Sequence, residues 1–126
     1  MRTILFAAAL LLGLTLAVAP ARADLFMTMG ANHVVQNTPL SDCNTRAKTA
    51  LADVLGATPL EAGTDSGEWL AYGGPADSNA ASIHCYPVGN GYVVTFECAV
   101  EVPPSPSMAT ALCTKLDAAF GGKQPS

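Results

Sequence analysis

The stretch GNGYVVTFECAVEV, residues 89–102, decides the fold of this chain. Its Gly-Asn-Gly start is typical of a tight hairpin turn, because glycine and asparagine adopt positive φ at little cost. The residues after the turn alternate as in a strand with one buried and one solvated face. One face carries Tyr92, Val94, Phe96, Cys98 and Val100, and the other carries Val93, Thr95, Glu97, Ala99 and Glu101. We therefore predict an antiparallel hairpin of strands 80–86 and 92–102.

Apolar residues at helical spacing predict a first amphipathic helix over residues 40–55. Thr38 or Ser41 can supply the N-cap oxygen. Pro39 suits the first helical position, and Gly56 suits a left-handed exit from the last turn. The apolar stripe of this helix consists of Leu40, Cys43, Ala47, Leu51, Val54 and Leu55.

A second amphipathic helix is predicted over residues 106–120. Ser105 can cap it, Pro106 fits its first turn, and Gly121-Gly122 ends it. Its apolar stripe consists of Ala109, Leu112, Cys113, Leu116, Ala119 and Phe120. Each helix therefore has one face to bury against a sheet.

Two further strands, residues 25–30 and 67–73, complete the predicted architecture. The order of elements is then β-α-β-β-β-α. An antiparallel sheet of four strands with both helices on one face buries both apolar stripes. We therefore predict an α+β two-layer sandwich.

Residues 1–23 read as a cleavable secretory signal peptide. A single arginine is followed by an uncharged apolar run, which ends at Pro20. Ala21-Arg22-Ala23 then presents small residues at the positions that a signal peptidase reads, so we expect the mature chain to begin at Asp24. The expected product is one secreted domain, residues 24–126, without stable membrane insertion. The short signal favours a bacterial periplasm.

Charge excludes some partner classes for the mature domain. Removing 23 residues from the 126 of the chain leaves 103, which suits one domain with its own core. All ten acidic residues fall in this part, against four basic ones, so its net charge is about −6 with histidine neutral. Nucleic acid and anionic lipid bind largely through Lys and Arg, and are therefore poor partners.

Four cysteines in an exported chain of this size predict two disulfides. No two of them are close enough in sequence for a redox dithiol or a paired zinc motif. Cys98 lies about 13 Å back along its strand from Pro103-Pro104, and Cys113 lies about 11 Å along the second helix. Because these distances match, we favour the pair Cys98–Cys113, which leaves Cys43–Cys85.

The sheet face opposite the helices is the predicted interaction surface. The side chains expected there are Trp69, His84, Tyr86, Thr95 and Glu97. His84 would lie opposite Thr95 or Glu97, depending on the turn register. Such a face could bind an unknown protein, a small ligand or a second copy of the chain as a homodimer. The alternatives are a polar His84–Glu97 pair in water and a Trp69 covered at the sheet edge by residues 58–66.

A second hypothesis is a metal site built from thioethers and imidazoles, which favour copper. Its candidate ligands are Met27, Met29, His33 and His84. Met27 and Met29 would share one strand face. With Leu25 they equally resemble an ordinary core row, since methionine is a common gap-filler. We therefore favour no metal and no other cofactor.

No catalytic constellation is evident in the sequence. His84 lacks a nucleophile, because the neighbouring Cys85 points to the other strand face. The glycine-rich segments 73–75 and 89–91 read as turns and lack the lysine of a phosphate-binding loop. We therefore expect a non-enzymatic exported domain that binds an unidentified ligand or protein. The alternative is a periplasmic copper-binding protein.

Overall fold

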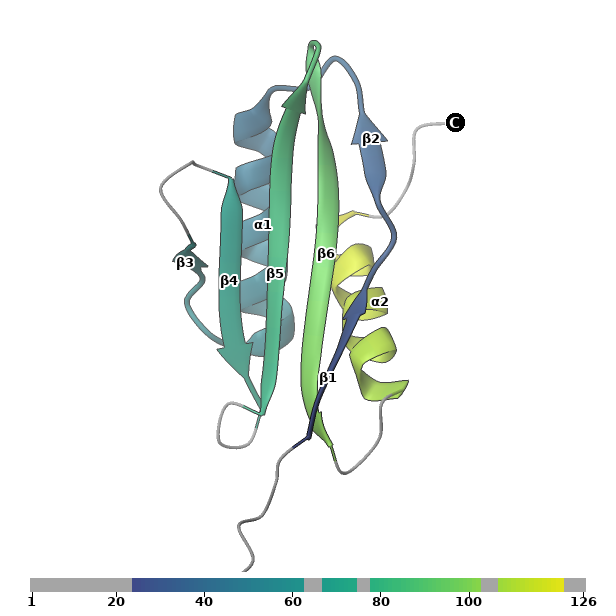
Figure 1. The fold of residues 1–126 in the computed structure, drawn as a ribbon. Helices are drawn as coiled ribbons and strands as arrows, with labels where there is room; N and C mark the ends of the chain where they lie inside the picture. The colour runs from purple at the N-terminus through teal and green to yellow at the C-terminus, as the bar shows by residue number, and fades with distance from the viewer. Residues whose placement is uncertain (1–23, 63–66, 75–77, 103–106, 122–126) are drawn as a thin grey trace, which may run out of the picture.

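A computed structural model shows eight elements in the part of the chain that it describes. It describes residues 24–62, 67–74, 78–102 and 107–121. The elements are β1 (Asp24–Met29), β2 (His33–Val35), α1 (Leu40–Leu55), β3 (Leu60–Glu61), β4 (Glu68–Gly73), β5 (Asn79–Val88), β6 (Gly91–Val102) and α2 (Ser107–Phe120) (Figure 1). The predicted signal peptide, residues 1–23, lies outside the described residues.

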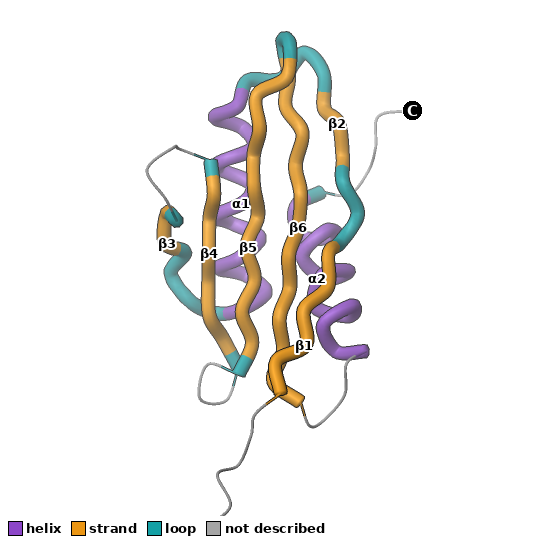
Figure 2. Tube along the Cα trace, in the orientation of Figure 1, coloured by secondary structure: helices purple, strands orange, loops and turns teal. Residues whose placement is uncertain are grey.

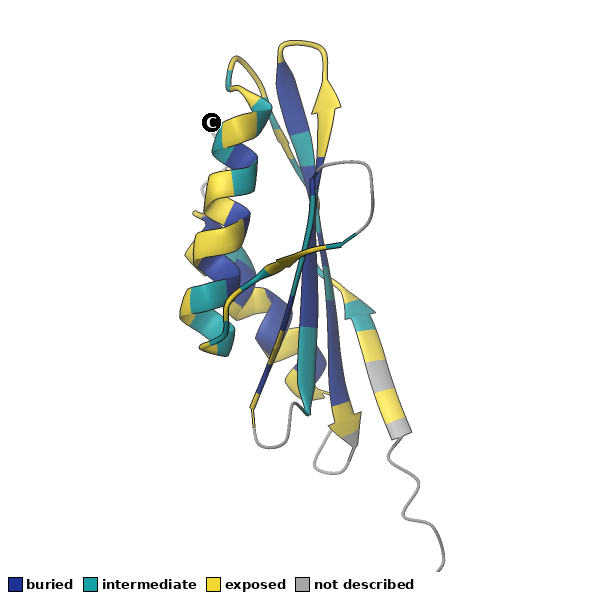
Figure 3. Cartoon of the chain, turned by 90° about the vertical axis from the view of Figure 1, so that its left-hand side faces the viewer, coloured by how far each residue is buried: buried dark blue, intermediate teal, exposed yellow. Residues whose placement is uncertain are grey.

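The strands form one antiparallel sheet in the order β1-β6-β5-β4-β3 (Figure 2). The short strand β2 continues the line of β1 and pairs with the same edge of β6. Helix α1 packs on β4 and β5, and helix α2 packs on β6 and β1. Both helices lie on the same side of the sheet (Figure 3). The α+β class is therefore confirmed, with a sheet of six strands where the sequence predicted four.

The alternation of residues 92–102 predicted a long strand, which the structure shows as the inner strand β6 over residues 91–102. Its inward side chains, from Tyr92 to Val100, are all buried. Val88 pairs with Gly91, so Gly89 and Asn90 form a two-residue turn, and Gly89 has a φ of 56°. This register places Cys85 opposite Val94.

Both helices occupy their predicted positions, with differences at the caps. Pro39 is the N-cap of α1 in an extended conformation, and not the first helical position that was predicted for it. Neither Thr38 nor Ser41 provides the expected cap oxygen. The Thr38 hydroxyl donates to the Gln36 carbonyl instead, and Ser41 lies inside the helix. Gly56 ends α1 in the left-handed conformation, with φ of 68°.

Helix α2 begins at Ser107, and the expected cap at residues 105–106 lies outside the described residues. Its predicted stripe is buried apart from Ala119, which is exposed. Ala119 was therefore wrongly assigned to the core. The next residue, Phe120, is buried and meets Phe96 edge-on, with ring centroids 5.6 Å apart.

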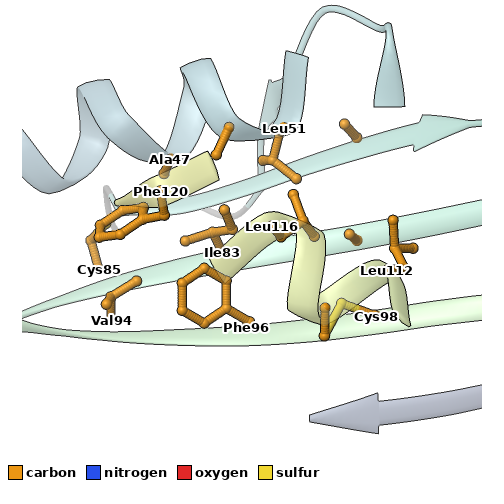
Figure 4. Packing of buried hydrophobic residues seen from close by; sticks show 14 of the residues in the cluster. Ala47, Leu51, Ile83, Cys85, Val94, Phe96, Cys98, Leu112, Leu116 and Phe120 are labelled. Atoms are coloured by element: carbon orange, nitrogen blue, oxygen red, sulfur yellow. A yellow bond between two sulfur atoms is a disulfide. The ribbon is translucent and has the colours of Figure 1, made fainter. Parts of the chain in front are cut away.

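The core lies between the helices and the inward face of the sheet (Figure 4). Its largest fully buried side chains include Phe96, Leu51, Ile83 and Leu116. Burial of such side chains is the main stabilising term for a domain of this size.

Tyr92 brings one polar group into this core. Its side chain is 1% exposed, and its hydroxyl donates to Oδ2 of Asp42 over 3.0 Å. Arg46 Nε donates to the same oxygen over 2.8 Å. Burial, followed by the hydrogen bond to Asp42 and the charge of Asp42, raises the pKa of Tyr92 from 10.0 to about 12, against a smaller lowering by Arg46.

Two disulfides connect the helices to the sheet. Cys43 of α1 is joined to Cys85 of β5, with Cα atoms 6.0 Å apart. Cys98 of β6 is joined to Cys113 of α2, with Cα atoms 5.7 Å apart. These are the two pairs that the sequence favoured. Structural disulfides of this kind are typical of an oxidising, extracellular-type environment. In the part of the chain that the structure describes, no helix is long and apolar enough to cross a membrane.

Candidate functional site

The sheet face turned away from both helices collects most of the exposed apolar side chains. Side chains of paired residues in adjacent strands point to the same face. Met27 of β1 lies opposite Ala99 of β6. Ala99 in turn lies opposite Ala80 of β5, which lies opposite Tyr72 of β4. We call the surface defined by this register the open face.

Eight of the nine exposed large apolar side chains in the described residues belong to the open face. These are Leu25, Met27, Met29, Val34, Leu60, Tyr72, Tyr86 and Val88. The exposed fractions of Leu25, Met27 and Met29 are 61%, 60% and 65%. Single exposed apolar residues are ordinary on proteins, whereas a contiguous exposed apolar surface is a common feature of interaction sites.

A shallow hollow of about 200 Å³ lies near the middle of the open face. Small side chains, Ala80, Ser82 and Ala99, form its floor on β5 and β6. Met27 of β1 and Leu70 of β4 rise on its two sides, because these longer side chains flank the small ones in the register. The hollow can therefore receive side chains from a partner.

A polar group lies between this hollow and the hairpin end of the face. His84 Nε2 is 2.7 Å from Oε2 of Glu68 on the adjacent strand β4. The Tyr86 hydroxyl is 2.8 Å from His84 Nδ1. Both ring nitrogens of His84 therefore have partners on this face.

The formal charges on the open face are all negative. Glu68, Glu97 and Glu101 all lie on it by register. None of the strands in the described residues carries Lys or Arg. The basic residues of the described chain lie on the helices, which carry Arg46, Lys48 and Lys115. The open face is thus apolar with an acidic character.

Trp69 is not on the open face, which corrects the sequence prediction. It pairs with the buried Ile83, so its side chain is on the helix side of β4. Its indole Nε1 donates to Oδ1 of Asn44 on α1 over 3.0 Å. Lys48 Nζ lies 4.6 Å from the indole ring centroid. Trp69 is therefore a half-buried packing residue beneath α1, rather than a ligand contact.

The other four predicted face residues lie on one surface. His84 lies opposite Thr95, and Glu97 lies opposite Ser82. A two-residue turn sets this register, and it selects Thr95 over Glu97, the two residues that the sequence left open as the neighbour of His84. Glu68 takes the place of Glu97 as the partner of His84.

The first strand, β1, was not predicted to belong to the open face. The Leu25, Met27 and Met29 row resembled a core row, but it lies exposed. The alternation was a valid signal for one shared face. Whether this row faces the helices or the solvent depends on the register in which β1 pairs with β6. The sequence of one strand alone does not reveal that register.

The four candidate copper ligands do not meet. Met27 and Met29 are on the open face, whereas His33 lies opposite the buried Val94 and faces the helices. His33 Nε2 is 2.5 Å from Oδ1 of Asp117 on α2. His84 is on the open face of β5 with its own partners. Within the described ranges, no three His, Cys, Asp or Glu side chains form a group that could hold a metal ion.

Comparison with known proteins finds no protein-family model that matches this chain and no curated protein that matches its sequence. Its function is therefore inferred from the residues of the site.

Proposed function

We propose that the mature chain is a non-enzymatic, exported domain that binds a partner protein through its open face. The observation that carries this proposal is the gathering of exposed apolar side chains on the one sheet face without helices. Water contact with such a surface is unfavourable, and a partner that covers it recovers free energy in proportion to the apolar area buried.

The dimensions of the open face favour a protein over a small ligand. The hollow measures about 200 Å³, whereas pockets that hold drug-sized ligands measure roughly 300–1,000 Å³ and enclose them. The apolar side chains extend well beyond it, from Leu25 near one end of the sheet to Tyr86 near the hairpin. A broad, shallow surface of this kind suits the apolar centre of a protein–protein interface.

Export to the periplasm is part of this proposal. The sequence of residues 1–23 supports it as a signal peptide, and the two disulfides support an oxidising destination. A binding role is also consistent with the engaged state of His84, whose two ring nitrogens both have partners on the face.

The test uses the full precursor, expressed with its own leader in a bacterium and recovered from the periplasm. A random peptide library displayed on phage is selected against this protein. The same selection is made against a triple variant of the open face, Met27→Ser, Met29→Ser and Tyr86→Ser. Met108→Ser is the matched control, because Met108 is an exposed methionine on α2.

We expect the wild-type protein and the Met108→Ser control to enrich the same peptides, and the triple variant to lose them. Circular dichroism of the triple variant checks that it remains folded, as the exposure of all three side chains predicts. Enrichment that survives the triple change, or no enrichment by any of the proteins, contradicts the proposal. Mass spectrometry of the same sample shows whether the chain begins at Asp24.

A further inference from the structure

The width of the open face points to the shape of its occupant. Met27 of β1 and Leu70 of β4 border the hollow, and strands β6 and β5 lie between them. Three inter-strand spacings separate β1 from β4, a distance of about 14 Å. An α-helix with its side chains is about 10–12 Å across. A helix therefore fits between these two rows, with its apolar side against the small residues of the floor.

The length of the face is also that of a helix rather than a short loop. Strand β6 extends over 12 residues, which corresponds to about 40 Å at the usual rise of a strand. Exposed apolar side chains accompany it from Leu25 to Tyr86 on the neighbouring strands. A helix of about 18 residues covers about 27 Å of this length.

Charge selects among amphipathic helices. Glu97 borders the hollow, and Glu101 lies beyond Ala99 on the same face of β6. Neither carboxylate has an ion-pair partner within the described residues, unlike Glu68, which contacts His84. A helix with Lys or Arg beside its apolar stripe complements these two groups. A second copy of the chain would instead bring acidic faces together.

We propose that the partner segment is a cationic amphipathic α-helix, seated between β1 and β4 on the open face. This inference rests on the proposed function and adds the chemistry of the partner. The apolar stripe of the helix covers Met27 and Leu70, and basic residues that border the stripe approach Glu97 and Glu101, which lie on β6 between those two rows. The recognition mode is that of an amphipathic helix laid into an apolar groove.

The test measures binding of designed helical peptides by fluorescence anisotropy. Three labelled peptides of about 18 residues share one leucine stripe and carry Lys, Gln or Glu at the remaining positions. The protein is the exported wild type, and the variants are Glu97→Gln with Glu101→Gln, and the open-face triple variant. Asp53→Asn is the control, because Asp53 is an exposed acid on α1.

We expect the Lys peptide to bind most tightly and the Glu peptide least. The double Gln change should weaken the Lys peptide about three- to tenfold at low salt, and added salt should reduce this difference, because exposed charge pairs are weak and screened. Asp53→Asn should change nothing, and the open-face triple variant should lose binding of the Lys peptide.

Different failures separate this inference from the proposed function. If the Gln peptide binds as tightly as the Lys peptide, and the double Gln change has no effect, the cationic partner is wrong. If no helical peptide binds while phage-selected peptides still require the open face, the helix is wrong and the proposed function stands. If sedimentation shows a dimer that the triple variant disrupts, the face belongs to a second copy. If no peptide of either kind requires the open face, both proposals fail.

Discussion

Replacing Trp69 with alanine tests which side of the sheet carries the core. The indole ring lies half-buried between β4 and α1, donates to Asn44 and supports Lys48. Removal of a fully buried large aromatic side chain costs about 3–5 kcal/mol, and half-burial reduces this to about 2 kcal/mol. The lost hydrogen bond contributes about 1 kcal/mol, and the exposed cation–π contact contributes about 0.5 kcal/mol. We therefore expect Trp69→Ala to lower the free energy of unfolding by about 3.5 kcal/mol.

Tyr86→Ala is the matched change on the open face. The Tyr86 side chain is 46% exposed, and its hydroxyl contacts only the surface residue His84 among the described residues. We expect a cost below about 1 kcal/mol. Lys48→Ala, which keeps the indole, should also cost less than about 1 kcal/mol, because it removes only the cation–π contact.

Urea unfolding followed by far-ultraviolet circular dichroism compares these variants. Circular dichroism is used because Trp69 is the only tryptophan in the sequence, so the Trp69→Ala variant has no tryptophan fluorescence. Midpoints at an unchanged m-value convert directly into differences in stability. A Trp69→Ala variant within about 0.5 kcal/mol of wild type, or a Tyr86→Ala variant that costs as much as Trp69→Ala, would refute the placement of the two side chains on opposite faces.

Two further predictions concern the core. The Cys43–Cys85 disulfide closes a sequence separation of 42 and the second disulfide one of 15, so the chain-entropy model gives stabilisations of about 4 and about 3 kcal/mol. In urea unfolding, replacing Cys43 and Cys85 with alanine should therefore lower the free energy of unfolding more than replacing Cys98 and Cys113 does. The reverse order would contradict the prediction. The pKa of Tyr92 is raised to about 12 in the folded protein, so its contribution to stability is complete below pH 10 and is lost as the pH rises from 10.0 to about 12. Over that pH range the thermal unfolding temperature should fall, and it should fall less in Tyr92→Phe than in the wild type. An equal fall in the two proteins would show that Tyr92 is not its source.

Long periodic segments made most of the fold predictable. Residues 91–102 alternate without interruption, and α1 begins and ends where its apolar spacing indicated. The disulfide pairs followed, because a strand and helix joined by a short connection bring Cys98 and Cys113 together. Strands β2 and β3 were missed, since three and two residues are too short to establish a period.

The path from β1 to β2 depends on a close contact that sequence does not display. Gly30 lies between them, and its backbone nitrogen donates to the Phe96 carbonyl over 2.9 Å. A Cβ atom at Gly30 would lie 3.0 Å from the Cβ of Phe96. The absence of a side chain lets the backbone remain against β6 at this point, which allows β2 to continue the same edge.

The candidate site was predictable only in part, because the facing of two strands was ambiguous. In β4, both alternating sets contain apolar residues, with Trp69 and Ala71 on one side and Leu70 and Tyr72 on the other. The sequence pattern does not indicate which of the two sets faces the helices. The pairing of β4 with β5 decides this. The methionine row of β1 was ambiguous for the same reason.

The most direct measurement is a map of amide chemical-shift changes on the exported protein as the Lys peptide is added. Binding to the open face predicts changes along β1, β4, β5 and β6, centred on Met27 and Ala99, with little change on the solvent side of α1. The structure offers a contrasting location, a hollow of about 230 Å³ between the helices, lined in part by Met108 and Lys115. Shift changes centred on that hollow, with an unchanged open face, would contradict the proposed binding surface.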